Sequence, residues 1–242
     1  MIPPYFSMSE RWLVHTVVFD LDDTLYAESD YVLSGFRAVD EWLQKDQNVD
    51  GFFPRAKHQF LGGHRGRIFN EVLAELKISD PENVLVKQLI AVYRLHKPTL
   101  NLYPDAIEAL AWCEGRFNIG LITDGYREVQ YLKISALALD KSIPFRMVTD
   151  SLGREFWKPS PEPFRRVSAH YGGALGGFVY VGDNPRKDFI GARSLGWRTV
   201  RVRRREGEHS SYEPNLIESA ELEITSLSQL KTLLIQWGDG SK

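Results

Sequence analysis

The feature that most restricts the fold of this chain is a regular alternation of short apolar runs and helical patterns. Alternating units of this length need right-handed crossovers, which place parallel strands in one sheet with helices on both faces. The chain is therefore predicted to form an α/β fold, a Rossmann-like doubly wound parallel sheet. The predicted strands cover residues 13–19, 117–123, 144–149, 178–183 and 197–202. The predicted helices cover residues 104–115, 126–139, 160–172, 185–196 and 226–237.

Residues 28–98 have a different pattern, with apolar residues at helical spacing and no convincing strand. The segment that follows contains Pro98 and Pro104, which interrupt helices and return the chain to the α/β pattern. A chain of 242 residues has room for one domain of ordinary size with a smaller insert. We predict an α/β part made of residues 1–27 and 99–242, and a helical insert over 28–98.

Composition excludes several classes of partner. A net charge of −2 gives no general attraction to nucleic acid or to an anionic membrane. No stretch approaches the roughly 20 apolar residues that span a bilayer, and residues 1–12 lack the pattern of a signal peptide. The single cysteine, Cys113, excludes an internal disulfide and is predicted to be inert packing on a helix. We therefore expect a cytoplasmic protein without nucleic-acid or membrane partners.

One basic segment, "RVRRREGEH" at 201–209, permits a nucleic-acid interpretation. The alternative is a charged strand end followed by a loop, and the near-neutral charge of the whole chain favours it. The arginines concerned are Arg201, Arg203, Arg204 and Arg205.

Polar side chains that suit metal and phosphate follow several predicted strands. The first strand runs into "VVFDLDDTLY" at 17–26, where neighbouring carboxylates would repel each other unless a cation or a proton intervened. In an open parallel sheet, ligands bind beyond the carboxyl ends of the strands. The sequence therefore predicts a metal and phosphate site at this edge. Its candidate residues are Asp20 and Asp22, Thr123 and Asp124, Asp183 and Asp188, and Lys158 just before a helix.

Four segments resemble the ordered motifs of the haloacid dehalogenase superfamily. They are "DLDDTL" at 20–25, "ITDG" at 122–125, "KPSPEPF" at 158–164 and "GDNPRKD" at 182–188. The resemblance covers residues 13 to about 200, and the helical insert stands where one branch of that family has its mobile cap.

The resemblance implies phosphoryl transfer through an aspartyl-phosphate. Asp20 is the expected nucleophile, and a carboxylate in this role divides one hard displacement into two easier ones. Mg²⁺ is the expected cofactor, because it prefers hard oxygen ligands and bridges carboxylates to phosphate. Its expected ligands are Asp20, Asp183 and the backbone carbonyl of Asp22. Asp188 is expected to orient either a metal-bound water or Lys158.

The remaining roles concern charge and protons. Lys158, Thr123 and the backbone N–H of Asp124 are expected to hold the phosphoryl oxygens. Asp22 is expected to protonate the leaving alkoxide and then to take a proton from the attacking water. Halides leave without a proton, so this acid favours phosphate monoesters over halogenated substrates. Asp23 is interpreted as a solvated turn residue or helix N-cap.

The insert is expected to select the substrate. In "FLGGHRGRIFN" at 60–70, the side chains of His64, Arg65 and Arg67 could meet an anionic or hydroxylated leaving group. The alternative interpretation, a surface loop with solvated charges, explains the same residues and is not excluded by the sequence.

The sequence therefore predicts a Mg²⁺-dependent phosphatase for a small phosphomonoester, a nucleoside monophosphate or a sugar phosphate. A phosphotransferase or phosphomutase with the same intermediate is the alternative within enzymes, and a non-catalytic phosphate-binding module is the alternative outside them. The sequence leaves both a monomer and a homodimer open.

Overall fold

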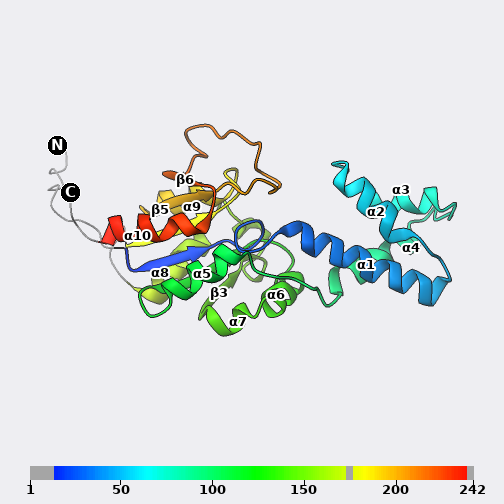
Figure 1. The fold of residues 1–242 in the computed structure, drawn as a ribbon, viewed down its shortest axis with the longest axis horizontal. Coiled ribbons are helices and arrows are strands. Elements are labelled where there is room, and N and C mark those ends of the chain that lie inside the picture. The colour runs from blue at the N-terminus through cyan, green and yellow to red at the C-terminus, as the bar shows by residue number, and fades with distance from the viewer. Residues whose placement is uncertain (1–13, 173–176, 239–242) are drawn as a thin grey trace. The chain divides into compact units, whose positions relative to one another are not determined.

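The computed structural model describes residues 14–172 and 177–238, and they form two compact units (Figure 1). Among the described residues, the first unit consists of 14–27, 102–127, 138–172 and 177–238. The second consists of Glu28–Asn101 and Glu128–Leu137. Residues 128–137 fall in the part of the sequence that is predicted to be α/β. Residue 13, where the first strand was predicted to begin, and the segment 1–12 lie outside the described residues.

The first unit is built on a parallel sheet of six strands in the order β3-β2-β1-β4-β5-β6. The strands are β1 (Thr16–Phe19), β2 (Asn118–Thr123), β3 (Phe145–Val148), β4 (Phe178–Gly182), β5 (Arg198–Val202) and β6 (Leu222–Ile224). Every residue of β1 and β4 is buried, as expected for strands covered on both faces. The predicted Rossmann-like α/β fold is confirmed.

Five of these strands lie where the sequence predicted them, and β6 was missed. It has only three residues, and the side chains of Leu222 and Glu223 are exposed. A strand this short and this exposed lacks the apolar alternation by which strands are recognised. The predicted helix 126–139 is divided in the structure, because Ala138 adopts a left-handed conformation with φ 54°.

Helices cover the sheet in separate groups. α8 packs on β2, α9 packs on β4 and β5, and α5 packs with α10. One buried cluster joins α8 and α9 to side chains of alternate strand residues, among them Val18, Ile122 and Tyr180. The helices of this unit are α5 (Pro104–Cys113), α7 (Leu139–Ser142), α8 (Glu162–Tyr171), α9 (Asp188–Ser194) and α10 (Leu230–Gly238), with 3₁₀ turns at η1 (Thr149–Ser151), η2 (Arg154–Phe156) and η3 (Leu227–Gln229).

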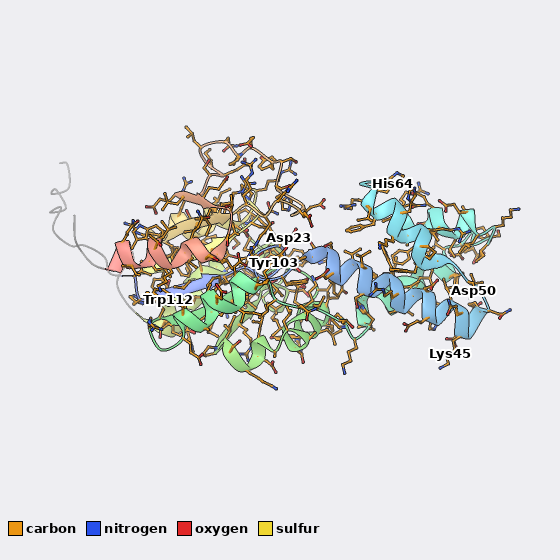
Figure 2. All side chains as sticks on the ribbon, viewed as in Figure 1. Asp23, Lys45, Asp50, His64, Tyr103 and Trp112 are labelled. Carbon is orange, nitrogen blue, oxygen red and sulfur yellow. The ribbon has the colours of Figure 1, made fainter. Side chains whose placement is uncertain are left out.

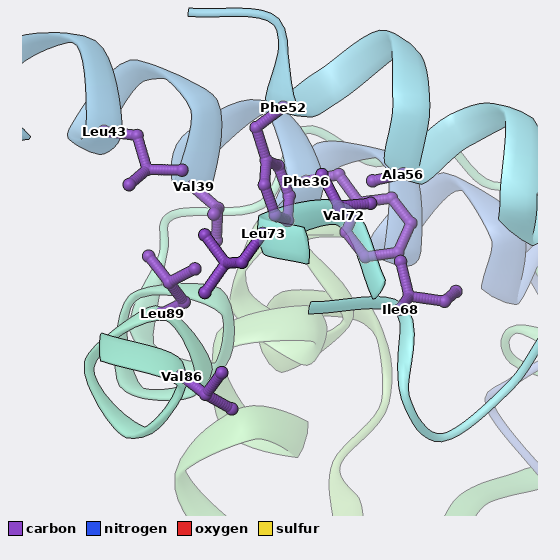
Figure 3. Close-up of a cluster of buried hydrophobic side chains, with 10 residues drawn as sticks. All are labelled: Phe36, Val39, Leu43, Phe52, Ala56, Ile68, Val72, Leu73, Val86 and Leu89. Carbon is purple, nitrogen blue, oxygen red and sulfur yellow. The ribbon is translucent and has the colours of Figure 1, made fainter. Parts of the chain in front are cut away.

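The second unit is helical, and residues 28–101 contain no strand. Its elements are α1 (Glu28–Gln47), α2 (Phe52–Leu61), α3 (Ile68–Glu75), α4 (Val84–Leu95) and most of α6 (Arg127–Ala136). α1 to α4 bury a common apolar core whose centre includes Phe36, Phe52 and Leu73 (Figure 3). Because the helices share this core, the unit has its own source of hydrophobic stability.

Two close contacts explain how the helices of the second unit pack. Gly35 of α1 faces the ring of Tyr93, and a Cβ atom at position 35 would lie 2.4 Å from that ring. Lys133 of α6 is buried, and its ammonium lies 4.5 Å from the centre of the Tyr31 ring. α6 therefore belongs to this unit through packing on α1, although the chain reaches it directly from β2.

Within the described residues, no helix combines the length and the apolar character required to cross a membrane. Cys113 is fully buried, and burial raises the pKa of its thiol to about 12. The thiol is therefore protonated at neutral pH, as expected of an inert packing residue.

Candidate active site

The order of the strands places the three acidic or polar strand ends next to one another. β1 lies between β2 and β4, and all three run parallel, so their carboxyl ends meet at one edge of the sheet. Asp20 follows β1 directly, Thr123 is the last residue of β2, and Asp183 follows β4 directly. All three residues are buried. The backbone N–H of Asp20 donates to the carbonyl of Val181 at 2.8 Å, which fixes the start of the acidic segment against β4.

Lys158 is the centre of the site. Its side chain is fully buried, and its ammonium contacts a carboxylate oxygen of Asp20 at 2.5 Å and one of Asp188 at 2.8 Å. The hydroxyl of Tyr180 lies 2.8 Å from the same ammonium and donates to the carbonyl of Ile122 at 3.2 Å. An ammonium in this position holds two carboxylates that would otherwise repel each other.

Asp20, Asp183 and Asp188 form a cluster of oxygen ligands. One carboxylate oxygen from each lies within 4.8 Å of the others, and all three side chains are buried. Asp188 is fixed from its second oxygen, which accepts the backbone N–H of Asn184 at 2.8 Å. A set of hard oxygen donors with excess negative charge fits a small divalent cation such as Mg²⁺.

In the absence of a cation, the ionised carboxylates of the acid cluster are costly to bury. Burial raises the pKa of Asp20 to about 6, against the opposing attraction of Lys158. Burial, with repulsion from Asp188 and Asp20, also raises the pKa of Asp183 well above its usual range. Burial alone would lower the pKa of Lys158, but Asp188 and Asp20 raise it well above its usual range. Lys158 is therefore charged, and further positive charge would stabilise the ionised form of Asp183.

The carboxylate of Asp124 connects three of the sequence motifs. One oxygen accepts the hydroxyl of Thr149 at 2.7 Å and the backbone N–H of Lys158 at 3.1 Å. The other lies 3.5 Å from the ammonium of Lys187. The sequence predicts that the backbone N–H of Asp124 holds a phosphoryl oxygen, and in the structure its side chain also joins the three motifs. Thr123, directly before it, is buried at the end of β2.

Asp22 is half-buried, and its carboxylate accepts a hydrogen bond from the hydroxyl of the fully buried Tyr26. Asp23 lies in a turn, as interpreted, but it is neither solvated nor the N-cap of α1, which begins at Glu28. Asp23 is 6% exposed and has a left-handed φ of 52°, and its carboxylate accepts the backbone N–H of Glu208 at 2.9 Å. The sequence could not show this, because the partner lies 185 residues further along the chain.

His64, Arg65 and Arg67 lie in the second unit, on the exposed segment between α2 and α3 (Figure 2, where His64 is labelled). The imidazole of His64 lies 3.3 Å from the carboxylate of Glu71. The guanidinium of Arg65 donates to the carbonyl of Phe60 at 2.9 Å and stacks over its ring at 4.2 Å. These contacts connect the segment to residues of α2 and α3.

Three of the four arginines of "RVRRREGEH" make ion pairs within the first unit. Arg201 pairs with Glu223 at 3.1 Å, and Arg204 pairs with Asp105 at 2.6 Å. Arg203 also pairs with Glu223, at 3.3 Å. This arrangement agrees with a charged strand end and loop, the interpretation that the sequence favoured over a nucleic-acid surface.

Sequence reasoning missed two functional-site neighbours. Tyr180 lies inside β4, and its only signal was a polar hydroxyl in an otherwise apolar strand. Lys187 lies inside "GDNPRKD", next to an assigned aspartate, and it brings a second ammonium to the acids. Burial and the charge of Lys158 would lower the pKa of Lys187, but the carboxylates of Asp20, Asp188 and Asp124 raise it.

This chain is similar to known proteins in sequence and in fold. A glyceraldehyde 3-phosphate phosphatase of Methanopyrus kandleri is 29% identical over 84% of this chain and 88% of its own. A phosphoserine phosphatase of Thermus thermophilus is 29% identical over 78% of this chain and 88% of its own. The crystal structure of a HAD-superfamily hydrolase from Geobacter sulfurreducens has a TM-score of 0.64, with 19% identity over 93% of this chain and 99% of that one.

The model of one protein family matches residues 17–202, which include all four motifs and the residues of the acid cluster. The chain therefore belongs to the haloacid dehalogenase-like hydrolases.

Proposed function

We propose that this protein is a Mg²⁺-dependent phosphatase that hydrolyses a small phosphomonoester through an aspartyl-phosphate on Asp20. The observation that carries the proposal is the buried ammonium of Lys158, held 2.5 Å from Asp20 and 2.8 Å from Asp188 beside Asp183. This arrangement combines a carboxylate nucleophile, a fixed positive charge and oxygen ligands for a cation. The names of the two phosphatase relatives support the same reaction class.

Asp20, Asp183 and the backbone carbonyl of Asp22 are the groups that would hold Mg²⁺. The carboxyl groups fit this ion because each offers a hard oxygen, and because burial makes the ionised form of Asp183 costly without a cation. When bound, the ion supplies charge neutralisation to the phosphoryl oxygens. Asp188 orients Lys158, whose ammonium lies 2.8 Å from its carboxylate.

In the first half of the reaction, a carboxylate oxygen of Asp20 attacks phosphorus, and the bond from phosphorus to the leaving oxygen breaks. The electron pair of that bond passes to the leaving oxygen, which takes a proton from Asp22 and departs as an alcohol. Lys158, Thr123 and the backbone N–H of Asp124 stabilise the charge on the remaining phosphoryl oxygens.

In the second half, water attacks phosphorus and Asp22 takes its proton. The bond between phosphorus and Asp20 breaks, inorganic phosphate leaves, and the carboxylate is restored. The hydrogen bond from Tyr26 orients the carboxyl group of Asp22 for this exchange. A phosphotransferase would follow the same steps with a second hydroxyl in place of water, so only product analysis separates the two reactions.

We propose that residues 28–98 act as the cap that selects the substrate, with His64, Arg65 and Arg67 as the groups that meet the leaving group. A nucleoside monophosphate or a sugar phosphate is the substrate class we propose. Because Cys113 is the single cysteine and is buried as a thiol, a reducing cytoplasm is the compartment we expect.

A phosphate-release screen of the purified protein tests this function. Phosphorylated sugars, nucleoside monophosphates, glyceraldehyde 3-phosphate and phosphoserine are each supplied with Mg²⁺, with Ca²⁺ or with excess chelator. We expect release with Mg²⁺, little with Ca²⁺, whose larger and looser coordination misaligns Asp20, and none with chelator. The Asp20→Asn variant, whose side chain keeps its size but loses the charge, serves as the control. Full activity in chelator, or in Asp20→Asn, contradicts the proposal.

A further inference from the structure

Arg201 is unusual because a charged side chain occupies an interior strand of the sheet. It belongs to β5, which lies between β4 and β6, and its side chain is 2% exposed. Removing a guanidinium from water is costly unless its N–H donors all make hydrogen bonds or ion pairs. An apolar residue of similar size would fill the same space at no such cost. The hydrogen bonds and the ion pair of Arg201 therefore indicate the structural role of this residue.

The guanidinium of Arg201 connects the strand end that carries Asp183 to a long loop. Its Nε donates to the backbone carbonyl of Asp183 at 3.4 Å. Its Nη2 donates to the carbonyl of His209 at 2.7 Å and to that of Tyr212 at 3.1 Å, while Nη1 pairs with Glu223. The planar fork of arginine suits such a divided set of acceptors, whereas a lysine could not reach them together.

The same loop is also attached to the segment that carries the nucleophile. We call residues 203–213, which follow β5, the 203–213 loop (orange in Figure 1). The backbone N–H of Glu208 in this loop donates to the carboxylate of Asp23 at 2.9 Å, and Arg204 donates to the carbonyl of Thr24 at 2.9 Å. The guanidinium of Arg204 also stacks over Tyr103 at 4.0 Å (Figure 2 labels Asp23 and Tyr103).

The loop thus spans two separate parts of the acid cluster. Through Asp23 and Thr24 it holds the turn that follows Asp20, and through Arg201 it holds the main chain of Asp183. These two parts must stay at a fixed spacing to bind one small cation, because Mg²⁺ demands near-ideal octahedral geometry. Groups that orient metal ligands in this way commonly change metal affinity by about 10- to 100-fold when they are removed.

We propose that Arg201 and the 203–213 loop form a clamp that sets the distance between Asp20 and Asp183, so that Arg201 is a positioning residue for the cation. The inference rests on the proposed function, because it assumes Mg²⁺ at this cluster. Arg201 touches neither substrate nor cation in this role. It acts through the main chain of Asp183 and through the two loop carbonyls that it binds.

The test compares Mg²⁺ binding in two arginine variants of the same strand, measured by isothermal titration calorimetry with MgCl₂ alone. Arg201→Met removes the clamp. Arg198→Met is the matched control, since Arg198 also belongs to β5 and pairs with an acid, Glu221 at 2.8 Å, but is partly exposed. We expect Arg201→Met to weaken Mg²⁺ binding at least about tenfold and Arg198→Met to leave it unchanged. Unchanged Mg²⁺ affinity in a folded Arg201→Met, even with a lower melting temperature, overturns the inference.

If Arg201→Met does not fold, a second pair of variants tests the same clamp. Asp23→Asn and Asp23→Gly both remove the charge and both tolerate the left-handed backbone, but only Asn keeps an oxygen for the N–H of Glu208. We expect Asp23→Gly to bind Mg²⁺ several-fold more weakly than Asp23→Asn, and equal affinities refute the clamp. If the wild-type protein binds no Mg²⁺, both the proposed cofactor and this inference are contradicted. If the wild-type protein binds Mg²⁺ and the variants bind it equally well, only this inference is contradicted.

Discussion

Replacing Lys158 by methionine should destabilise the metal-free protein strongly, because it removes one partner from a buried group of charges. The ammonium is fully buried between the carboxylates of Asp20 and Asp188, which are also buried. Methionine fills a similar volume, so the packing loss is small and the electrostatic loss dominates. Removing one partner of a buried ion pair costs about 3–5 kcal/mol, because the charges left behind have no compensation.

The cost should depend on pH in a defined direction. Burial already raises the pKa of Asp20 to about 6 in the folded protein, from 3.8, and the loss of Lys158 would raise it further. A carboxyl group whose pKa is higher in the folded state favours folding fully below its unfolded-state pKa, and this contribution is lost as the pH rises through its folded-state pKa. The destabilisation by Lys158→Met should therefore be larger at pH 8 than at pH 5.

The assay is urea unfolding followed by tryptophan fluorescence, in excess chelator, at pH 5 and pH 8. Arg198→Met is the control, because its ion pair with Glu221 is partly exposed and such pairs contribute less than about 1 kcal/mol. We expect Lys158→Met to lose about 3 kcal/mol or more at pH 8 relative to wild type. A loss no larger than that of the control, or one that grows toward acid pH, would refute this account of the site.

Three further predictions concern separate parts of the molecule. Asp22→Ala should reduce kcat for alkyl phosphates at least about a hundredfold. It should reduce kcat for p-nitrophenyl phosphate far less, because p-nitrophenolate leaves without a proton. Equal losses in the two steady-state assays would exclude Asp22 as the general acid. Arg65→Ala and Arg67→Ala should each lower kcat/KM for the natural substrate at least about tenfold, or about 1.4 kcal/mol, and leave a small generic ester unaffected; similar effects on both substrates would exclude this segment as a substrate reader. Burial alone would raise the pKa of Asp105, but the hydrogen bond from Arg204 holds this pKa below 3.8. The ionised carboxylate therefore stabilises the fold above about pH 4, and this stabilisation is lost as the pH falls through the folded-state pKa. Asp105→Asn should then lower the free energy of unfolding at pH 7 by about 1–2 kcal/mol and have a smaller effect below about pH 4, as urea titrations would show; a pH-independent effect would contradict the ion pair.

Much of the fold could be predicted because its determinants are local. The strands β1, β2 and β4 are short runs of β-branched and aromatic residues, and each is followed by the polar residues of a motif. Since parallel strands end at the same edge, the meeting of Asp20, Thr123 and Asp183 follows from pattern and topology together.

The features that the sequence did not reveal depend on contacts between distant segments. β6 is recognisable as a strand only through its pairing with β5. Asp23 is buried because the backbone of Glu208 needs an acceptor there. Arg201 is buried because its guanidinium bonds both the carbonyl of Asp183, which ends another strand, and carbonyls of the 203–213 loop. A helical pattern such as 128–137 shows which face is apolar but not which helices will cover it, and that segment packs on α1.

The covalent role of Asp20 is the central claim, and reductive trapping tests it most directly. The Asp22→Ala variant, which should break down the intermediate slowly, is mixed with p-nitrophenyl phosphate and Mg²⁺ and quenched during turnover. Borohydride reduces an acyl phosphate to an alcohol, so a phosphorylated Asp20 becomes homoserine, which peptide mass spectrometry can locate. We predict homoserine at residue 20 and at no other aspartate, and none in the Asp20→Asn background. Turnover of p-nitrophenyl phosphate with residue 20 unmodified, or with the label on another carboxylate, would contradict the account.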